Sequence, residues 1–527
     1  MKAKAWRLYG AGDARLEDIE LEGAGDEGIV VELVTNTICL SDYKGASLGT
    51  GHKRVPRDIA TRPSMFGHEV SGIVREVGTK WKNQFHVGQH VGLQPSLNIP
   101  GHELETVGYA WHTIGGETTH VYLPSIVMEM GCLLPYDGDA YFKCSLAEPI
   151  SCIVSAFRTN YHNAFCSHDL EVGIVDKGTM LLMAGCGAMG LGCIDIACHS
   201  PEKRPRRLVV TDIDDARLKR AAAIFGVTRG QARSSVSREP SEASPEGVRQ
   251  QPRACESGLG GGTREACYPE ARAQSRAIVA QGVVNGVELI FVNTKDVADP
   301  VSLLKSFNLV DDARADNPTS TGGGYDDIFL MAAVPALITQ CSELLGFGGC
   351  LNFFAGPTNQ QLMAEFNFYN VHYLMHHVVA NSGGDVKDMS DSVDWIGKGY
   401  LHPEVMITHV GGLDSAFEAT MNILKIPGGK RLVYTHKKLP MTAIADFAEL
   451  GRGRSPSAPF YAELDRICSA NHGLWCKEAE DYLLANAPEI EIGEPKELVK
   501  ERIIRLREAE LANQDSLREA ELANHDR

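Results

Sequence analysis

A glycine-rich turn between an apolar segment and a helical segment constrains the fold of this 527-residue chain more than any other feature. The apolar residues 178–184 resemble a short buried strand, and the pattern Gly185-x-Gly187-x-x-Gly190 follows them before a helix-like segment. A second apolar strand ends at Asp212, about where a dinucleotide-binding unit places its ribose-binding acid. We expect the first glycine to make the tight turn, the second to admit the pyrophosphate and the third to let helix and strand meet.

The acid at the end of the second strand bears on the choice of cofactor. A carboxylate at Asp212 would accept hydrogen bonds from the adenosine ribose and would repel a 2′-phosphate. The sequence therefore favours NAD(H), with NADP(H) left open as the alternative. Met189 lies inside the glycine turn and joins the candidate cofactor-binding residues.

Strand and helix patterns continue to alternate after this unit. Residues 288–293, 327–331 and 350–357 are typical of further buried strands, and residues 334–345 are typical of a helix between two of them. This alternation predicts a doubly wound parallel sheet.

Residues 228–280 do not fit this alternation. They are rich in Arg, Ser, Pro, Gly and Glu, contain neither Lys nor Asp, and have too few apolar residues to form a layer of the sheet. The segment is either a disordered surface insertion or an out-of-frame stretch.

A second constellation, between residues 39 and 69, predicts a metal site. Cys39, His68 and Glu69 are metal-ligand side chains, and a thiolate with an imidazole suits zinc best. Each of them alone is more often a structural residue than a ligand. Asp42 offers a carboxylate that could orient the imidazole, and Ser41 offers a hydroxyl for proton relay.

These residues form a pattern that resembles a known family. Cys-x-Ser-Asp at residues 39–42 and Gly-His-Glu-x-x-Gly-x5-Gly at residues 67–78 resemble the zinc signature of the medium-chain alcohol and polyol dehydrogenases. Gly67 and Gly72 bracket the His-Glu pair as if the backbone must pass close to something, while Trp81 stands where the signature normally has a small residue. The resemblance implies a β-rich, GroES-like catalytic domain, a Rossmann sheet and a zinc- and NAD(P)-dependent oxidoreductase.

The third protein ligand is less clear from the residues themselves. Glu148 precedes Pro149 and could equally be a carboxylate that favours the start of a helix. In the polyol dehydrogenase branch this position carries a zinc-site ligand, so the resemblance implies Glu148 as the third ligand. Glu69 is then an alternative ligand or a carboxylate beside the ligands. Residues 94–120 contain no Cys, so we predict one catalytic zinc and no structural zinc.

The resemblance also implies roles for two side chains near the metal. Ser41 would donate the proton to the forming alkoxide. Lys44 stands where this superfamily often has the His that ends the proton relay, so it either ends the relay or binds a substrate phosphate. Residues 52–54, His-Lys-Arg, are further phosphate candidates or a solvated basic turn.

A less specific similarity to one branch of this family extends over most of residues 1–490. Residues 51–56, 114–117, 352–357 and 366–373 and the extension after Tyr434 resemble the ketose-phosphate reductases of this family. The resemblance implies reduction of L-sorbose 1-phosphate to D-glucitol 6-phosphate. The alternatives are a polyol or alcohol dehydrogenase with an unphosphorylated substrate, and a non-catalytic nucleotide-binding homologue whose sheet the unusual segment disrupts.

Charge and cysteine usage restrict the partners. The 51 basic and 68 acidic residues give a net charge of −17, which argues against nucleic acid or an anionic membrane. The N-terminus has no apolar signal core, and the longest apolar run, residues 179–194, contains four glycines and is short for a membrane span. The 14 scattered cysteines fit reduced thiols, so we expect a cytoplasmic enzyme with a sugar or sugar-phosphate substrate. The resemblance also implies that the protein forms a homodimer or homotetramer.

These patterns divide the chain into four parts. We expect a GroES-like zinc domain over residues 1–155, a Rossmann domain over 156–360, a return to the first domain over 361–440, and a helical extension and tail over 441–527. The return would close with a strand at 426–434. Residues 440–495 are predicted to be helical and polar, and an eleven-residue repeat after residue 505 is typical of a solvated helical tail.

Overall fold

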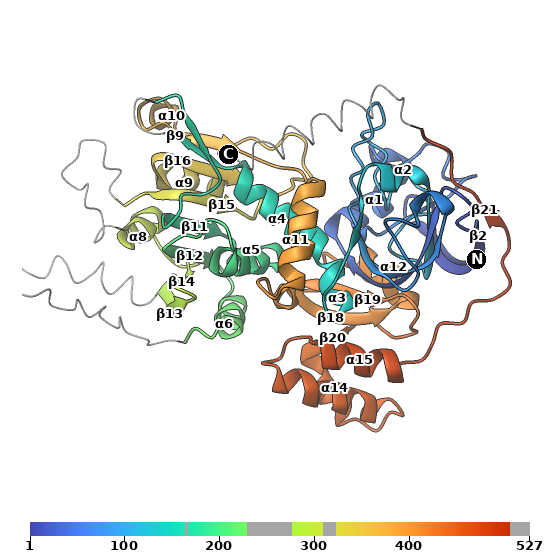
Figure 1. The fold of residues 1–527 in the computed structure, drawn as a ribbon. Helices are drawn as coiled ribbons and strands as arrows, with labels where there is room; N and C mark the ends of the chain where they lie inside the picture. The colour runs from blue at the N-terminus through green and yellow to red at the C-terminus, as the bar shows by residue number, and fades with distance from the viewer. Residues whose placement is uncertain (164–166, 229–276, 309–322, 506–527) are drawn as a thin grey trace, which may run out of the picture.

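The computed structural model describes residues 1–163, 167–228, 277–308 and 323–505. Two bodies lie side by side, and α4 (Ala147–Thr159) and α11 (Val386–Gly397) lie between them (Figure 1). Residues 229–276 of the predicted insertion and the predicted repeat after residue 505 lie outside the described part of the chain. The other described α-helices are α1 (Leu40–Leu48), α2 (Ser125–Glu129), α3 (Tyr141–Ser145), α5 (Ala188–His199), α6 (Asp215–Ile224), α8 (Pro300–Ser306), α9 (Pro335–Leu344), α10 (Phe368–Tyr373), α12 (Ala416–Met421), α13 (Phe447–Gly451), α14 (Ala458–Ala470) and α15 (Lys477–Asn486).

A sheet of eight strands organises the first body. Its strands are β3 (Ile29–Ile38), β5 (Glu69–Val77), β6 (His90–Leu93), β7 (His120–Leu123), β8 (Leu133–Pro135), β18 (Ile407–Gly412), β19 (Lys430–Tyr434) and β20 (Thr442–Ala443). The order is β20-β18-β19-β3-β5-β6-β8, with β7 also paired to β3. The central strand β3 is rich in β-branched residues and buried almost throughout, as expected for a strand covered on both faces.

A smaller sheet completes the first body. Its order is β21-β2-β1-β4, and its strands are β1 (Lys2–Gly10), β2 (Asp13–Leu21), β4 (Ser64–Met65) and β21 (Leu498–Val499). The strand β21 pairs in parallel with β2, so the end of the described chain lies beside its beginning (Figure 1). The β-rich first body agrees with the fold class predicted from the sequence.

The second body contains the predicted Rossmann sheet. Its strands are β11 (Thr179–Met183), β12 (Arg207–Asp212), β13 (Ile278–Val284), β14 (Val287–Asn293), β15 (Tyr325–Leu330), β16 (Leu345–Phe353) and β17 (His377–Val379). They stand in the order β13-β14-β12-β11-β15-β16-β17, so the last strand comes from beyond residue 360. Alternate residues of β11 enter two cores: Met180 and Leu182 pack on the side of α4 and α5, and Leu181 and Met183 on the opposite side. This two-sided burial is the layering of a doubly wound fold.

One edge of this sheet differs from the expected parallel arrangement. The strand β13 runs antiparallel to β14, although we expected no strand pattern before about residue 280 and parallel strands after it. Asn285 and Gly286, with φ of 47° and 84°, connect the two strands in a two-residue turn, because Val284 pairs with Val287. Positive φ at both positions is typical of the tight turns that join antiparallel strands.

The C-terminal part returns to the first body. The strand β19, inside the predicted closing strand 426–434, pairs antiparallel with β3. The helices α13, α14 and α15 follow, but they are not uniformly polar as we expected. Their apolar faces pack with β19, where Trp475 is fully buried and donates a 2.8 Å hydrogen bond to the Tyr434 hydroxyl. Glu480 of α15 accepts hydrogen bonds from the backbone nitrogens of Tyr141 and Phe142, at 2.9 and 3.0 Å, where α3 begins.

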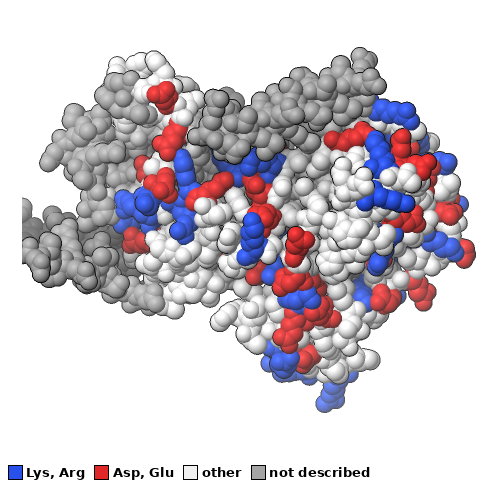
Figure 2. Space-filling view, viewed as in Figure 1, with Lys and Arg blue, Asp and Glu red and all other residues white. Residues whose placement is uncertain are grey.

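The described surface carries both signs of charge. On the face drawn in Figure 2, acidic and basic side chains are interspersed, and the coloured residues form no continuous basic surface there. Within the described ranges, no helix has the length and apolar character needed to cross a membrane.

Candidate active site

The structure brings Cys39 and His68 together from separate elements of the first body. Cys39 caps the N-terminus of α1, and its backbone nitrogen donates a 2.8 Å hydrogen bond to Asp42 Oδ2. The other oxygen of Asp42 lies 2.7 Å from His68 Nδ1. In the neutral imidazole this contact places the proton on Nδ1, so that Nε2 carries the lone pair that a metal ligand requires.

The turn before His68 is fixed by close backbone contacts. Gly67 has φ of +85°, and a Cβ on it would stand 3.0 Å from the backbone nitrogen of Glu117. At Gly72 a Cβ would stand 2.3 Å from the backbone oxygen of Glu32. The two glycines therefore let the strand pass close to its own neighbours, and this places the imidazole against α1.

Ser41 lies next to both of these side chains. Its hydroxyl donates to Cys39 Sγ at 3.0 Å, and its Oγ lies 3.4 Å from His68 Nε2. The ring of Tyr109 stands beside this group, with its centroid 5.8 Å from that of His68. Burial, the largest effect, raises the pKa of Tyr109 to about 12. Tyr109 could not be predicted as part of this site, because it lies in a loop with no recognisable motif.

Glu69 approaches the same group but already has partners. One ligand atom each from Cys39, His68 and Glu69 lie within 4.8 Å of one another. The Glu69 carboxylate is fully buried and accepts hydrogen bonds from Thr37 and from the ammonium of Lys430. Burial opposes the charge of Lys430, but the neighbouring Glu69 outweighs it and raises the pKa of the ammonium.

Glu148, in the first turn of α4, stands beside this group, but its carboxylate is not among the three ligand atoms that lie within 4.8 Å of one another. Its side chain is 9% exposed and interacts electrostatically with His68 and Glu69. The only described hydrogen bond to its carboxylate comes from the weak thiol donor of Cys152, at 3.8 Å. Burial, the largest effect, raises the pKa of Glu148 to about 7. Cys152 is a further neighbour that our sequence reasoning missed, although it lies one helical turn after Glu148.

Lys44 does not join this hydrogen-bond network. Its Nζ donates to the backbone oxygen of Gly356, at 3.3 Å, in the loop after β16. The side chain thus connects the first body to the second at the edge of the group.

The second body places the predicted glycine turn between β11 and α5. A Cβ on Gly190 would stand 2.1 Å from the backbone oxygen of Gly185, so the helix and the turn can meet only without a side chain there. Gly187 has no atom within 4 Å of such a Cβ, so its face is open, as a phosphate approach requires. Asp212 ends β12 beside this turn, and its Oδ2 accepts from the backbone nitrogen of Cys186 at 3.3 Å. Met189 lies in the first turn of α5, partly buried against the core.

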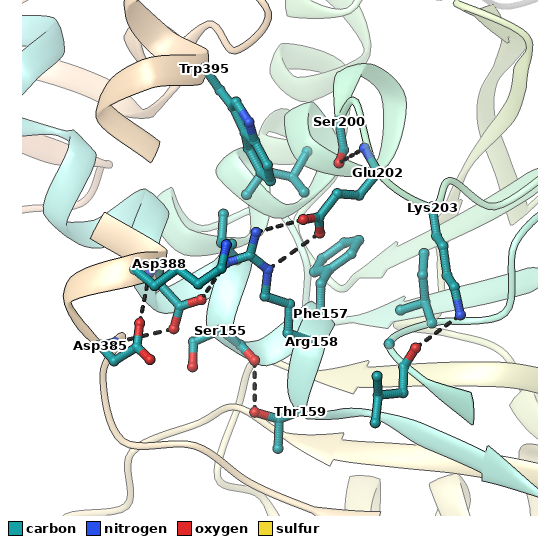
Figure 3. A pocket seen from close by; sticks show the side chains of 16 residues that line it. Ser155, Phe157, Arg158, Thr159, Ser200, Glu202, Lys203, Asp385, Asp388 and Trp395 are labelled. Carbon is teal, nitrogen blue, oxygen red and sulfur yellow. Dashed lines mark hydrogen bonds and ion pairs between the residues drawn. The ribbon is translucent and has the colours of Figure 1, made fainter. Parts of the chain in front are cut away.

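A pocket of about 590 Å³ lies elsewhere, against α4 and α11 (Figure 3). Arg158 enters it and pairs with Glu202, Asp388 and Asp391 at 2.6 to 2.8 Å. The two lysines of its lining, Lys203 and Lys387, also pair with carboxylates. Because these cations are neutralised, we assign the pocket no part in the chemistry.

Comparison with known proteins agrees with this arrangement. The family model for the alcohol dehydrogenase GroES-like domain matches residues 25–130. A mannitol-1-phosphate 5-dehydrogenase from Aliivibrio fischeri is 40% identical over 478 residues, which cover 90% of this chain and 96% of that protein. An L-sorbose 1-phosphate reductase from Klebsiella pneumoniae is 36% identical over 490 residues, covering 92% and 98%.

A solved structure shares the fold. The 2R,3R-butanediol dehydrogenase from Bacillus subtilis is 18% identical, with a TM-score of 0.55, and the match covers 82% of this chain and 99% of that one. The relatives that match almost the full length settle the family: this chain is an oxidoreductase that belongs to the zinc-dependent medium-chain alcohol and polyol dehydrogenases.

Proposed function

We propose that the protein reduces the ketone of a ketose phosphate, L-sorbose 1-phosphate to D-glucitol 6-phosphate, with bound zinc and NAD(P)H. The observation that carries the proposal is the pair Cys39 and His68, held by one carboxylate, with a serine hydroxyl next to both. The names of the two near full-length relatives support a sugar-phosphate substrate.

The residues present fit a zinc ion. Cys39 and His68 supply the thiolate and imidazole that zinc prefers. A buried carboxylate with only a thiol as hydrogen-bond partner is costly, and a cation beside it would remove that cost. Glu148 is such a carboxylate, whereas Glu69 is already matched by Lys430 and Thr37. We therefore propose Glu148 as the third ligand and assign Glu69 to the surroundings of the ligands.

The chemistry needs a hydride, a proton and a polarised carbonyl. Zinc when bound supplies a Lewis acid for the carbonyl oxygen, and the reduced nicotinamide supplies the hydride. Ser41 would give its proton to the oxygen that becomes the alcohol. Lys44 contacts Gly356 rather than Ser41, which favours a role in substrate binding over the end of the proton relay.

The nucleotide would bind at the turn before α5. The open face of Gly187 would receive the pyrophosphate, and Asp212 would accept hydrogen bonds from the adenosine ribose. This carboxylate supports NADH over NADPH. We also propose one zinc per chain, a cytoplasmic location and a homodimer or homotetramer, which remain predictions from the sequence.

Zinc content and NADH oxidation by the purified protein test the proposal together. We expect about one zinc per chain, oxidation of NADH with L-sorbose 1-phosphate, and loss of both in Cys39→Ser. Activity on L-sorbose alone would instead assign the chain to the dehydrogenases of unphosphorylated polyols. Protein without zinc and without activity on either ketose would contradict the proposed function.

A further inference from the structure

A group of basic side chains near the proposed metal site has no acidic partner. Within the described residues, Lys44, Lys53 and Arg54 form no ion pair with a carboxylate, although the chain as a whole carries 68 acidic residues. Unpaired cations that gather beside a reaction centre attract anions. We call Lys44, His52, Lys53 and Arg54 the basic group.

Within the basic group, Arg54 has the features most typical of an anion-binding side chain. Its side chain is half-buried, and its Nε is buried without any hydrogen-bond partner in the structure. Its guanidinium carbon lies 5.7 Å from the centroid of the Tyr109 ring. A buried donor without a partner is unfavourable, and an oxyanion would satisfy it together with the rest of the planar fork.

Tyr109 connects the basic group to the proposed metal site. His52 stacks on its ring with centroids 5.1 Å apart, and His68 lies 5.8 Å from the same centroid. The Arg54 guanidinium and the His68 imidazole therefore lie at similar distances, 5.7 and 5.8 Å, from the centroid of the same buried ring.

The remaining members add positive potential. Burial is the largest cause of the lowered pKa of His52, and Arg54, Lys53 and Lys44 add to it in that order. The three cations are therefore near enough to the His52 ring to disfavour a fourth positive charge. A phosphate that bound here would meet three permanent charges and the planar donors of Arg54.

We propose that Arg54 binds the phosphate group of a ketohexose phosphate, with Lys44, His52 and Lys53 around it. This proposal rests on the proposed function, because it supplies the substrate-recognition residues of the same site. The phosphate could be next to the ketone, as in L-sorbose 1-phosphate, or at the far end of the sugar, as in D-fructose 6-phosphate.

Kinetics of an Arg54→Gln variant test the proposal. One charge-assisted contact to phosphate contributes enough that its loss should raise KM for the phosphorylated ketose by roughly 10- to 150-fold. KM for NADH, kcat and KM for the unphosphorylated ketose should stay unchanged. Arg54→Lys keeps the charge but loses the planar fork of donors. Its KM for the phosphorylated ketose should therefore lie between the values of the wild type and of Arg54→Gln. Arg57→Gln is the matched control, because Arg57 lies in the same loop and donates to the backbone oxygen of Thr50.

The two phosphorylated ketoses are assayed in parallel. The isomer with the larger change in KM identifies the position of the phosphate relative to the ketone. Equal changes in KM for phosphorylated and free ketose, or no change, would overturn the assignment of Arg54. A change in KM for NADH alone would reassign Arg54 to the cofactor.

A binding measurement separates this proposal from the proposed function. Calorimetry on the zinc-loaded wild-type protein and on Arg54→Gln compares D-glucitol 6-phosphate with D-glucitol. Tighter binding of the phosphate ester that disappears in the variant supports the subsite even if the turnover assay fails. Equal affinity for the two polyols in the wild type would refute it even if zinc and turnover are as proposed.

Discussion

Asp42 accepts a 2.7 Å hydrogen bond from His68 Nδ1 with one carboxylate oxygen, and with the other it accepts from the backbone nitrogen of Cys39. One side chain therefore fixes the ring of one proposed ligand and the backbone of the other. Hydrogen bonds of the protein itself therefore hold the two proposed ligands next to each other.

Asp42→Asn should weaken zinc binding by about 10- to 100-fold, which is the usual effect of a group that orients a ligating imidazole. The amide oxygen can still accept from the Cys39 nitrogen, so α1 should keep its cap. Competition with a chelator of known affinity measures the effect, with Asp58→Asn on the surface as the control. Equal zinc affinity in the variant and the wild type would remove Asp42 from this role.

Glu148→Gln and Glu69→Gln should have opposite effects. Glu148→Gln should lose zinc, because it removes a proposed ligand, and should keep its stability in metal-free protein. Glu69→Gln should keep zinc but lower the free energy of unfolding by about 3–5 kcal/mol, because it leaves the buried ammonium of Lys430 unpaired. Metal analysis and thermal melts check both.

The double variant Glu69→Gln, Lys430→Met is the control for this pair. Replacing both partners removes the unpaired charge and should restore most of the lost stability. Loss of zinc from Glu69→Gln, with Glu148→Gln fully loaded, would instead make Glu69 the third ligand.

Two glycines of the nucleotide turn should respond differently to alanine. Gly190→Ala places a Cβ 2.1 Å from the Gly185 oxygen, so it should destabilise the fold by about 1–3 kcal/mol and disturb the turn. Gly187→Ala meets no atom within 4 Å and should leave thermal stability unchanged while it weakens NADH binding. Thermal melts and titration of NADH fluorescence measure the two effects. Normal NADH affinity in Gly187→Ala would place the pyrophosphate elsewhere.

A buried carboxylate between two histidines should give a pH-dependent stability. Asp195 lies 2.9 Å from His199 Nδ1 and 3.2 Å from His402 Nδ1. Burial opposes the charge of Asp195, but the hydrogen bonds from His199 and His402 lower its pKa. The hydrogen bond to Asp195 raises the pKa of His402.

The sign of each contribution defines a window for this group. The contribution of Asp195 is complete above its ordinary pKa of 3.8 and is lost as the pH falls through the folded value. The contribution of His402 is complete below its ordinary pKa of 6.5 and is lost as the pH rises through the folded value. The difference in melting temperature between wild type and Asp195→Asn should therefore be largest between these two values and smaller in alkaline solution. A constant difference from acid to alkaline pH would exclude the coupling.

The sequence predicts those parts of the site that are encoded locally. Cys39 and Asp42 share one turn of a helix, and His68 stands beside a glycine that only a tight backbone approach explains. The partner of Glu69 could not be predicted in the same way, because Lys430 lies 361 positions away. No local pattern in the sequence predicts this contact, because it depends on the pairing of both β5 and β19 with β3.

The edge of the second sheet was missed for a different reason. Val284-Asn285-Gly286-Val287 is a strong signal for a two-residue hairpin turn, but it directly follows the unusual residues 228–280, which we interpreted as one irregular segment.

In the C-terminal extension, the amino-acid composition concealed the apolar face of the helices. Charged residues are spread along α14 and α15, and yet Leu464 of α14 and Trp475, just before α15, lie in a continuous core.

The pairing of β21 with β2 and of β19 with β3 has a consequence for biosynthesis. A ribosome makes roughly 5–20 residues per second. The strands β2 and β3 are therefore synthesised tens of seconds before their partners β21 and β19. The second sheet, made almost entirely from consecutive strands, can assemble during that time. The first body, with the buried carboxylate that awaits Lys430, can close only after synthesis of the chain is nearly complete, so premature termination would leave a folded nucleotide domain beside an open metal site.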